Sequence, residues 1–388
     1  MKRFLTLVLI STLLFNSQAL AATKKPTVKP LKLITSVSNV DEYAGLVTSG
    51  TTIVVYGNKG DKSFAKGVDI TGKELWNLAL DSASPSVATA ATVDSAGTIW
   101  IAGSTSLQRA TPTPSPIATP LNPDNITAIP DIFTTDLDAF TLWSLNPTTQ
   151  ALTQYSLQLT SPILINAISA SKSGLTAVGS SGAVINSDLS GKISKPVFVG
   201  SGATNLEAVV KASDGSMTVV GSSSETLSGK KLAGKVDGVI IKLSKIGKVI
   251  SVVRSSAPKA LRNWNSASTS LLLGGEVITS NKIESAVTKF SNSYMPTWTY
   301  RFLSTGKTFT SGSTYAFLQS KGALTQLANW SPKSPTPLLL TFDAKGAITG
   351  GYSAPVEQKE VLGLYFSKDL GILCISASAD TVSIFTLN

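Results

Sequence analysis

The feature that most constrains the fold is a unit of four short strand-like segments in residues 211–254. The segments read KASDG, SMTVVGSSS, DGVIIKLSK and IGKVISVVR, with an insertion between the second and the third. Short apolar runs bounded by Gly, Asp and Ser are typical of β-strands joined by turns. Related units recur from Asp41 to the C-terminus, so we predict an all-β chain that forms a single β-propeller.

We label the four strands of a unit a to d, from the axis outwards. Strand b is the clearest marker, because it is an apolar run that usually ends in glycine. Seven copies occur, the last two degenerate, at residues 53–57, 99–103, 175–179, 217–221, 271–274, 315–318 and 372–375. They predict seven four-stranded blades. A ring of six or eight blades is the alternative, because the sixth unit is poorly marked.

The two ends of the repeat array complement each other. The seventh unit stops after its third strand, residues 381–387, whereas strand-like residues 31–38 stand before the first unit without a partner. We expect these two segments to pair, because that pairing closes the ring and removes two exposed sheet edges.

The N-terminus has the pattern of a secretory signal peptide. Lys2 and Arg3 precede an apolar run at residues 4–15 and an Ala-Leu-Ala site at residues 19–21. The run is too short to span a membrane. We therefore expect a signal peptide at 1–21, a linker at 22–30 and a β-propeller domain at 31–388, with a Pro-rich insertion at 106–135. The mature protein is expected to be secreted, extracellular or associated with the cell surface, without a transmembrane segment.

Composition excludes several kinds of chemistry. The chain has no histidine, which removes Ser-His-Asp triads, Cys-His pairs and His-ligated metals. Its single cysteine, Cys374, lies in an apolar run and is expected to be a buried thiol. The net charge of +10 favours anionic partners, but basic residues are not interleaved with aromatics as in nucleic-acid-binding proteins. We predict no cofactor, no metal site and no catalytic residue, and we expect a monomer.

Two units resemble a known repeat. The second unit contains WIAGSTS at 100–106 and DAFTLWSLNP at 138–147, and the fourth contains VVGSSS at 219–224 and DGVIIKLSKIGKV at 237–249. These segments are similar to the SBBP repeat of bacterial secreted β-propeller proteins. The resemblance implies a secreted or surface-exposed propeller, and most members of the family have no assigned activity.

Long b–c connections suggest one binding face. Insertions at 106–135, 222–236 and 320–337 all follow strand b, so they emerge from the same face, and we expect them to surround the channel mouth. Trp330 is the candidate aromatic anchor. Lys230, Lys231 and Lys235 are the candidate cationic flank. On the opposite face, turn lysines form a predicted basic rim for an anionic envelope surface or for solubility: Lys73, Lys192, Lys248 and Lys345.

Three functions are compatible with these features. The first is a binding or scaffold module that captures an extracellular protein or glycan through the b–c face. The second is a hydrolase or lyase acting on polysaccharide, or a quinone-dependent enzyme, although we lean against an enzyme. The third is a structural envelope protein. A convergent set of acids at the channel would favour the enzyme. Three aspartates at the start of strand c are instead expected to bind nearby backbone: Asp138, Asp237 and Asp380.

Overall fold

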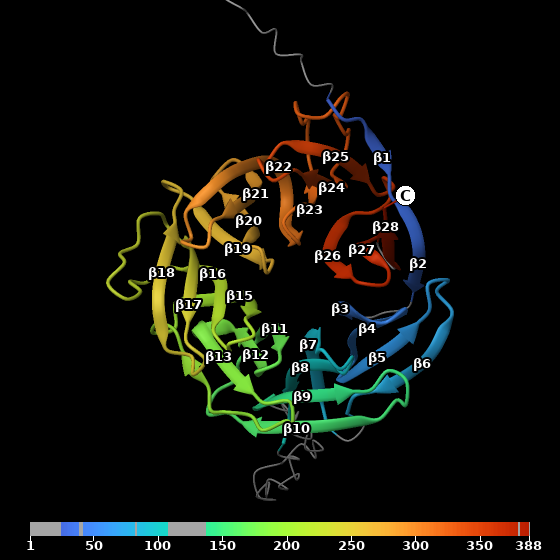
Figure 1. Cartoon of the computed structure of the whole chain (residues 1–388), viewed down its shortest axis with the longest axis vertical. Coiled ribbons are helices and arrows are strands. Elements are labelled where there is room, and N and C mark those ends of the chain that lie inside the picture. The colour runs from blue at the N-terminus through green and yellow to red at the C-terminus, as the bar shows by residue number, and fades with distance from the viewer. Residues whose placement is uncertain (1–24, 39–41, 82–83, 108–136, 379–380, 388) are drawn as a thin grey trace, which may run out of the picture.

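The computed structural model describes residues 25–38, 42–81, 84–107, 137–378 and 381–387. Antiparallel sheets are arranged around a central axis (Figure 1), which confirms the predicted all-β single propeller. The expected signal peptide and most of the Pro-rich insertion at 106–135 lie outside the described residues. No helix in the described ranges is long and apolar enough to cross a membrane.

Five sheets contain four strands each. The first comprises β3 (Glu42–Ser49), β4 (Thr52–Lys59), β5 (Lys62–Val68) and β6 (Glu74–Ala79). The second comprises β7 (Ser86–Val93), β8 (Ile99–Thr105), β9 (Ala139–Leu145) and β10 (Leu152–Gln158). The third comprises β11 (Ile165–Ser171), β12 (Gly174–Gly179), β13 (Ala183–Ser187) and β14 (Val197–Phe198). The fourth comprises β15 (Thr204–Lys211), β16 (Met217–Ser223), β17 (Asp237–Leu243) and β18 (Val249–Ser255). The fifth comprises β26 (Glu360–Ser367), β27 (Gly371–Ala377), β28 (Thr381–Thr386) and β2 (Lys32–Ser38).

The remaining strands form one sheet of eight, where we expected two separate blades. It comprises β19 (Leu261–Ala267), β20 (Leu272–Ile278), β21 (Ile283–Phe290), β22 (Pro296–Ser311), β23 (Tyr315–Ser320), β24 (Thr336–Phe342), β25 (Ile348–Ser353) and β1 (Val28–Pro30). The cause is β22, whose first half pairs with β21 and whose second half pairs with β23. Gly306 lies within β22 and makes no turn, so the backbone stays extended from one set of strands to the next.

The N-terminal segment joins the edges of two sheets. β1, which includes the end of the expected linker, pairs in parallel with β25. β2 pairs with β28, with Val37 opposite Val382 and Lys32 opposite Thr386. Figure 1 shows β1 and β2 following each other along the outside of the ring. Between them, Leu31 donates its backbone N–H to Ser353 O at 2.9 Å and is 6% exposed.

The core lies between neighbouring sheets. The middle strands of each sheet are covered on both faces, which is why strand b reads as a continuous apolar run. β4 and β12 are buried along nearly their whole length, whereas the outer strand β10 alternates between half-buried and exposed residues. Trp143 and Trp264 are fully buried in this core, and Trp298 stacks on Phe342 with ring centroids 5.0 Å apart. Cys374 is buried as predicted, and burial raises the pKa of its thiol.

Candidate functional site

A β-bulge interrupts six of the described inner strands, in the first half of five of them and past the middle of β19 (Leu261–Ala267). In β15 the pairing with β16 shifts between Leu206 and Ala208, so Glu207 is the extra residue. Equivalent shifts in β3, β7, β11, β19 and β26 leave one extra residue each, namely Ala44, Thr89, Asn166, Asn265 and Leu362. A bulge leaves its extra residue outside the ladder and re-aims the side chain. The repeated bulge therefore builds a ring of re-aimed side chains around the axis.

The glycine that ends strand b accommodates this bulge. A Cβ at Gly221 would overlap the carbonyl oxygen of Asn205, just before the bulge of the neighbouring inner strand. Gly103 and Gly179 meet the carbonyl oxygens of Val87 and Leu164 in the same way. Such close backbone approach is a position that only glycine fills without displacement. At these three positions the glycine that marks the end of strand b is thus required by the bulge.

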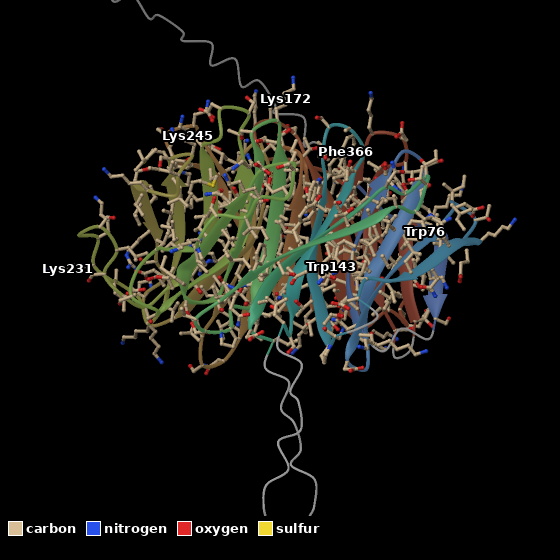
Figure 2. The ribbon with its side chains drawn as sticks, turned by 90° about the horizontal axis from the view of Figure 1, so that it is seen from below. Trp76, Trp143, Lys172, Lys231, Lys245 and Phe366 are labelled. Carbon is tan, nitrogen blue, oxygen red and sulfur yellow. The ribbon has the colours of Figure 1, made fainter. Side chains whose placement is uncertain are left out.

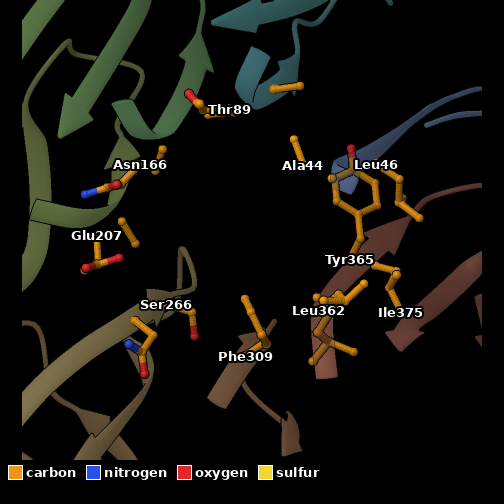
Figure 3. Close-up of a pocket in the computed structure, with 18 of the residues that line it drawn as sticks. Ala44, Leu46, Thr89, Asn166, Glu207, Ser266, Phe309, Leu362, Tyr365 and Ile375 are labelled. Carbon is orange, nitrogen blue, oxygen red and sulfur yellow. The ribbon is translucent and has the colours of Figure 1, made fainter. Parts of the chain in front are cut away.

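The re-aimed side chains line a central cavity of about 300 Å³. Figure 3 shows its two unlike halves. Thr89, Asn166, Glu207 and Ser266 lie on one side of the opening, whereas mainly apolar side chains occupy the other: Ala44, Leu46, Leu362, Tyr365 and Ile375. Phe309 lies between the two groups. A cavity with one polar and one apolar wall is typical of a site that orients a small ligand.

A chain of side-chain amides fixes the carboxylate on the polar side. Asn205 Nδ2 donates to Glu207 Oε1 at 2.5 Å. Asn166 Nδ2 donates to Asn205 Oδ1 at 3.0 Å and to Leu206 O at 2.9 Å, so it links β11 to β15. Because the hydrogen bonds run across two blades, Glu207 is held by its neighbours before any ligand arrives.

Asn265 is the second notable residue of the polar side. It is only 7% exposed, yet neither its Oδ1 nor its Nδ2 has a hydrogen-bond partner among the described residues. Its neighbour Ser266 is satisfied, because Ser266 Oγ donates to Thr308 O at 3.0 Å. A buried amide without partners costs free energy, and native proteins rarely leave one unless something else binds it. Asn265 therefore offers a donor and an acceptor to a ligand in the cavity.

Tyrosines complete the apolar side. Burial raises the pKa of Tyr365, against a smaller opposing effect of hydrogen bonds with Thr48. Burial likewise raises the pKa of Tyr43, whose hydroxyl has no hydrogen-bond partner among the described residues. These phenols are therefore neutral near pH 7, and Glu207 supplies the charge of the cavity lining.

The structure places Trp330 differently from the prediction of an exposed anchor. The indole is half-buried against the core beside β23 and β24, and its Nε1 donates to Ser320 Oγ at 3.0 Å. Its insertion folds back, because Leu324 and Leu327 are buried and Ala328 N donates to Pro26 O at 2.9 Å. Apolar residues inside the insertion favour this packing over projection into solvent.

Lys230, Lys231 and Lys235 are exposed as predicted, but they lie away from the cavity. Figure 2 shows Lys231 at the outer margin of the ring, not at the mouth of a channel. The loop is held there by Arg254, which donates to the carbonyl oxygens of Glu225 and Lys230 and pairs with Asp237 at 3.2 Å.

Aspartates at the start of strand c bind backbone, as expected. Asp237 accepts from the N–H groups of Ala233 at 2.9 Å and Gly234 at 2.8 Å. Asp138 accepts from Leu107 N at 3.2 Å. Asp380 lies outside the described residues. These carboxylates organise the b–c connections and do not converge on the cavity.

Lys73, Lys192, Lys248 and Lys345 are all exposed on c–d turns. Figure 2 shows Lys245, from one of these turns, at the same face as Lys172 from an a–b turn. Hydrogen bonds with Thr71 and the nearby Lys73 lower the pKa of Asp69, and Ser190 and Lys192 act alike on Asp188. Because an aspartate shares the turn with Lys73 and with Lys192, the rim is less cationic than the lysines alone suggest.

The described residues contain no group of three or more potential metal-ligating side chains. The cavity lining likewise brings one carboxylate, Glu207, to the axis. Glycoside hydrolysis by the usual route needs a second carboxylate within about 5–10 Å of the first. The convergent acids that would favour an enzyme are thus not found in this lining.

Comparison with known proteins bears on the fold. No family model matches the sequence, and no curated protein does. Among 538 matching solved chains is the structure of U3-55K, a WD40 propeller, with a TM-score of 0.58 and 9% sequence identity. The match covers 93% of this chain and 100% of that one. The fold is that of a β-propeller. At this identity the likeness carries the fold alone, since one fold hosts many functions.

Sequence reasoning missed the bulge ring, although a signal for it exists. The residue after each extra residue is small: Gly45, Ala90, Ala167, Ala208, Ser266 and Gly363. Alignment of the inner strands on this small residue would have placed Asn166, Glu207 and Asn265 at one structural position. The alignment on strand b hid the pattern, because it treated strand a only as the segment before a turn.

Proposed function

We propose that the protein is a secreted, seven-bladed β-propeller that acts as a binding module and takes its ligand in the central cavity. The observation that carries this proposal is the ring of bulges, which places one extra side chain from each of six inner strands in the lining of the cavity. Bulges are enriched next to functional sites because they re-aim side chains at a cost in sheet pairing. The polar and apolar halves then give a ligand one orientation.

The core supports counting seven blades. Leu272, Val287 and Phe302, from one half of the eight-stranded sheet, share a hydrophobic cluster with Leu318 and Leu340 from the other half. Strands of one continuous flat sheet do not face each other in this way, so the two halves act as neighbouring blades. On this view the pairing of β2 with β28 closes the ring.

The b–c face is the proposed side of entry. In five of the six bulged inner strands the bulge lies in the first half of the strand. The first halves follow the d–a connections, on the same face as the b–c connections. Lys230, Lys231 and Lys235 lie on the outer part of this face, where they would attract an anionic surface of a larger partner. Secretion is proposed from the N-terminal sequence, residues 1–21.

A ligand screen tests the proposal. Saturation-transfer NMR with mixtures of monosaccharides, amino acids and organic amines should yield ligands that are lost when Ala44→Trp fills the cavity. Ala208→Leu is a milder second blocker, and the melting temperature of each variant checks its fold. Lys231→Ala, at the margin, should leave the same ligands bound. Ligands that survive both blockers but disappear with Lys231→Ala would place the binding site on the insertion and overturn the channel proposal.

A further inference from the structure

The charge of the cavity is opposite to that of the chain. The protein carries a net charge of +10, yet the cavity lining contains Glu207 and no Lys or Arg. The nearest cation along the same strand is Lys211. Its Nζ donates hydrogen bonds to Thr176 Oγ1 at 2.8 Å and to Asn186 Oδ1 at 3.4 Å, and not to Glu207. Glu207 takes part in no ion pair among the described residues. A carboxylate held in a confined site without a counter-ion attracts a cation.

The hydrogen-bonding groups around Glu207 suit an ammonium group. Asn205 binds Oε1, which leaves Oε2 for a ligand. On the next inner strand, Asn265 is 7% exposed and keeps both Oδ1 and Nδ2 without a partner among the described residues. An ammonium group has three donors and no acceptor, and Glu207 Oε2 and Asn265 Oδ1 are acceptors from neighbouring inner strands in the lining of the same cavity. Charge-assisted hydrogen bonds of this kind are the stronger ones in proteins.

The opposite wall requires an apolar body on the same ligand. Leu362, Tyr365 and Phe309 present hydrocarbon and aromatic surface across the opening from Glu207 (Figure 3). A bare metal ion would leave this wall in contact with water, and a sugar would place hydroxyl groups against it. A volume of about 300 Å³ is at the small end for ligand sites and accommodates one small molecule or one side chain.

We infer that the cavity binds an organic ammonium ion, a protonated primary amine attached to a short hydrocarbon or aromatic body. The inference rests on the proposed function, because it names the ligand class of the same site. The amine is either a free small molecule or a lysine side chain of a partner, and both present the same chemistry to Glu207 and Asn265.

Calorimetric titration of the full-length protein with 2-phenylethylamine and with its neutral counterpart 2-phenylethanol tests the inference. The amine should bind at least about tenfold more tightly than the alcohol, because a hydrogen bond to a charged group contributes more than one between neutral groups. Glu207→Gln should remove that preference. Glu360→Gln, an exposed carboxylate at the start of inner strand β26, should leave it unchanged. Asn265→Ala, which keeps the Glu207 carboxylate, should weaken binding of the amine by a smaller factor than Glu207→Gln does.

The outcomes separate the two proposals. Equal binding of amine and alcohol, unaffected by Glu207→Gln but blocked by Ala44→Trp, would overturn the ammonium inference and leave the channel site standing. Absence of binding by both probes, with the ligands of the NMR screen insensitive to Ala44→Trp, would overturn both. Nα-acetyl-lysine amide serves as the second probe. Tighter binding of that probe than of 2-phenylethylamine identifies a partner's lysine as the source, and the reverse order identifies a free amine.

Discussion

At Gly221 the carbonyl oxygen of Asn205 occupies the space that a methyl group would need. Such contacts at the ends of strand b couple the glycines to the bulges that shape the cavity. Asn265 shows the other side of this arrangement, because its buried amide lacks partners among the described residues. At the scale of the residue, therefore, features that cost stability cluster where we place the ligand, as is common at functional sites.

Gly221→Ala should destabilise the protein. The added methyl group has to displace backbone, not a flexible side chain, so we expect a loss of about 1–3 kcal/mol in the free energy of unfolding. Urea denaturation measures the loss. Gly306→Ala is the matched control, because nothing lies within 4 Å of the place that a Cβ would take there and its φ is not positive. Equal stability of Gly221→Ala and the wild type would contradict the proposed link between glycine and bulge.

Asp237 should make stability depend on pH. Burial raises its pKa, but hydrogen bonds from Ala233, Gly234 and Arg254 outweigh burial and lower the pKa below the ordinary value of 3.8. A carboxyl whose pKa is depressed by folding stabilises the protein above the unfolded pKa and loses that contribution as pH falls through the folded pKa. As the pH is lowered below about 4, we expect the urea concentration at the unfolding midpoint to decrease. The decrease should be less steep in Asp237→Asn than in the wild type. Parallel pH profiles would refute this role.

The N-terminal segment is the element with the largest structural effect for its length. β1 extends one sheet and β2 extends the next, so Leu31 sits where two blades meet. Its side chain packs with Phe317 of β23 and with Cys374 of β27. The sequence predicted β2, because the last unit lacked one strand and residues 31–38 had a strand pattern without a partner. It did not predict β1, because three residues are too few for alternation to distinguish a strand from a linker.

Leu31→Ala should cost about 2–5 kcal/mol of unfolding free energy, as is usual when a buried leucine is truncated. Leu33→Ala is the control on the same segment, because Leu33 is 51% exposed, and we expect a change within about 0.5 kcal/mol. Chemical denaturation with intrinsic fluorescence measures both. If the two variants lose equal stability, Leu31 is not the residue that fixes the segment to the ring.

At the scale of the whole molecule, the two faces differ in what their charges can do. The c–d turns carry lysines next to turn aspartates such as Asp69 and Asp188, which accept hydrogen bonds from the turn backbone. The lysines of the long b–c insertion lie at the margin, where Figure 2 shows Lys231. At 0.1 M salt, charges more than about 10 Å apart are largely screened from each other. The turn lysines and the insertion lysines therefore act as independent groups.

Replacement of Lys73, Lys192, Lys248 and Lys345 by Gln should change binding to anionic phosphatidylserine vesicles by less than about twofold in 0.1 M salt. The reason is that Asp69 and Asp188 share the turns of Lys73 and Lys192 and offset their charge. Co-sedimentation with the vesicles measures the effect. A tenfold loss that salt reproduces in the wild type would instead establish the rim as an attachment surface.

The sequence by itself determined the all-β repeat, the turn positions and the runs of strand b. Those signals are local: middle strands must be apolar on both faces, and turns need Gly, Asp or Ser at fixed places. It also anticipated that Asp237 binds backbone and that Cys374 is buried. Only the tertiary structure decided that β22 continues across two sets of strands and that Trp330 packs inward. It alone placed Asn166, Glu207 and Asn265, far apart in the chain, around one cavity, because such convergence depends on how blades close about an axis.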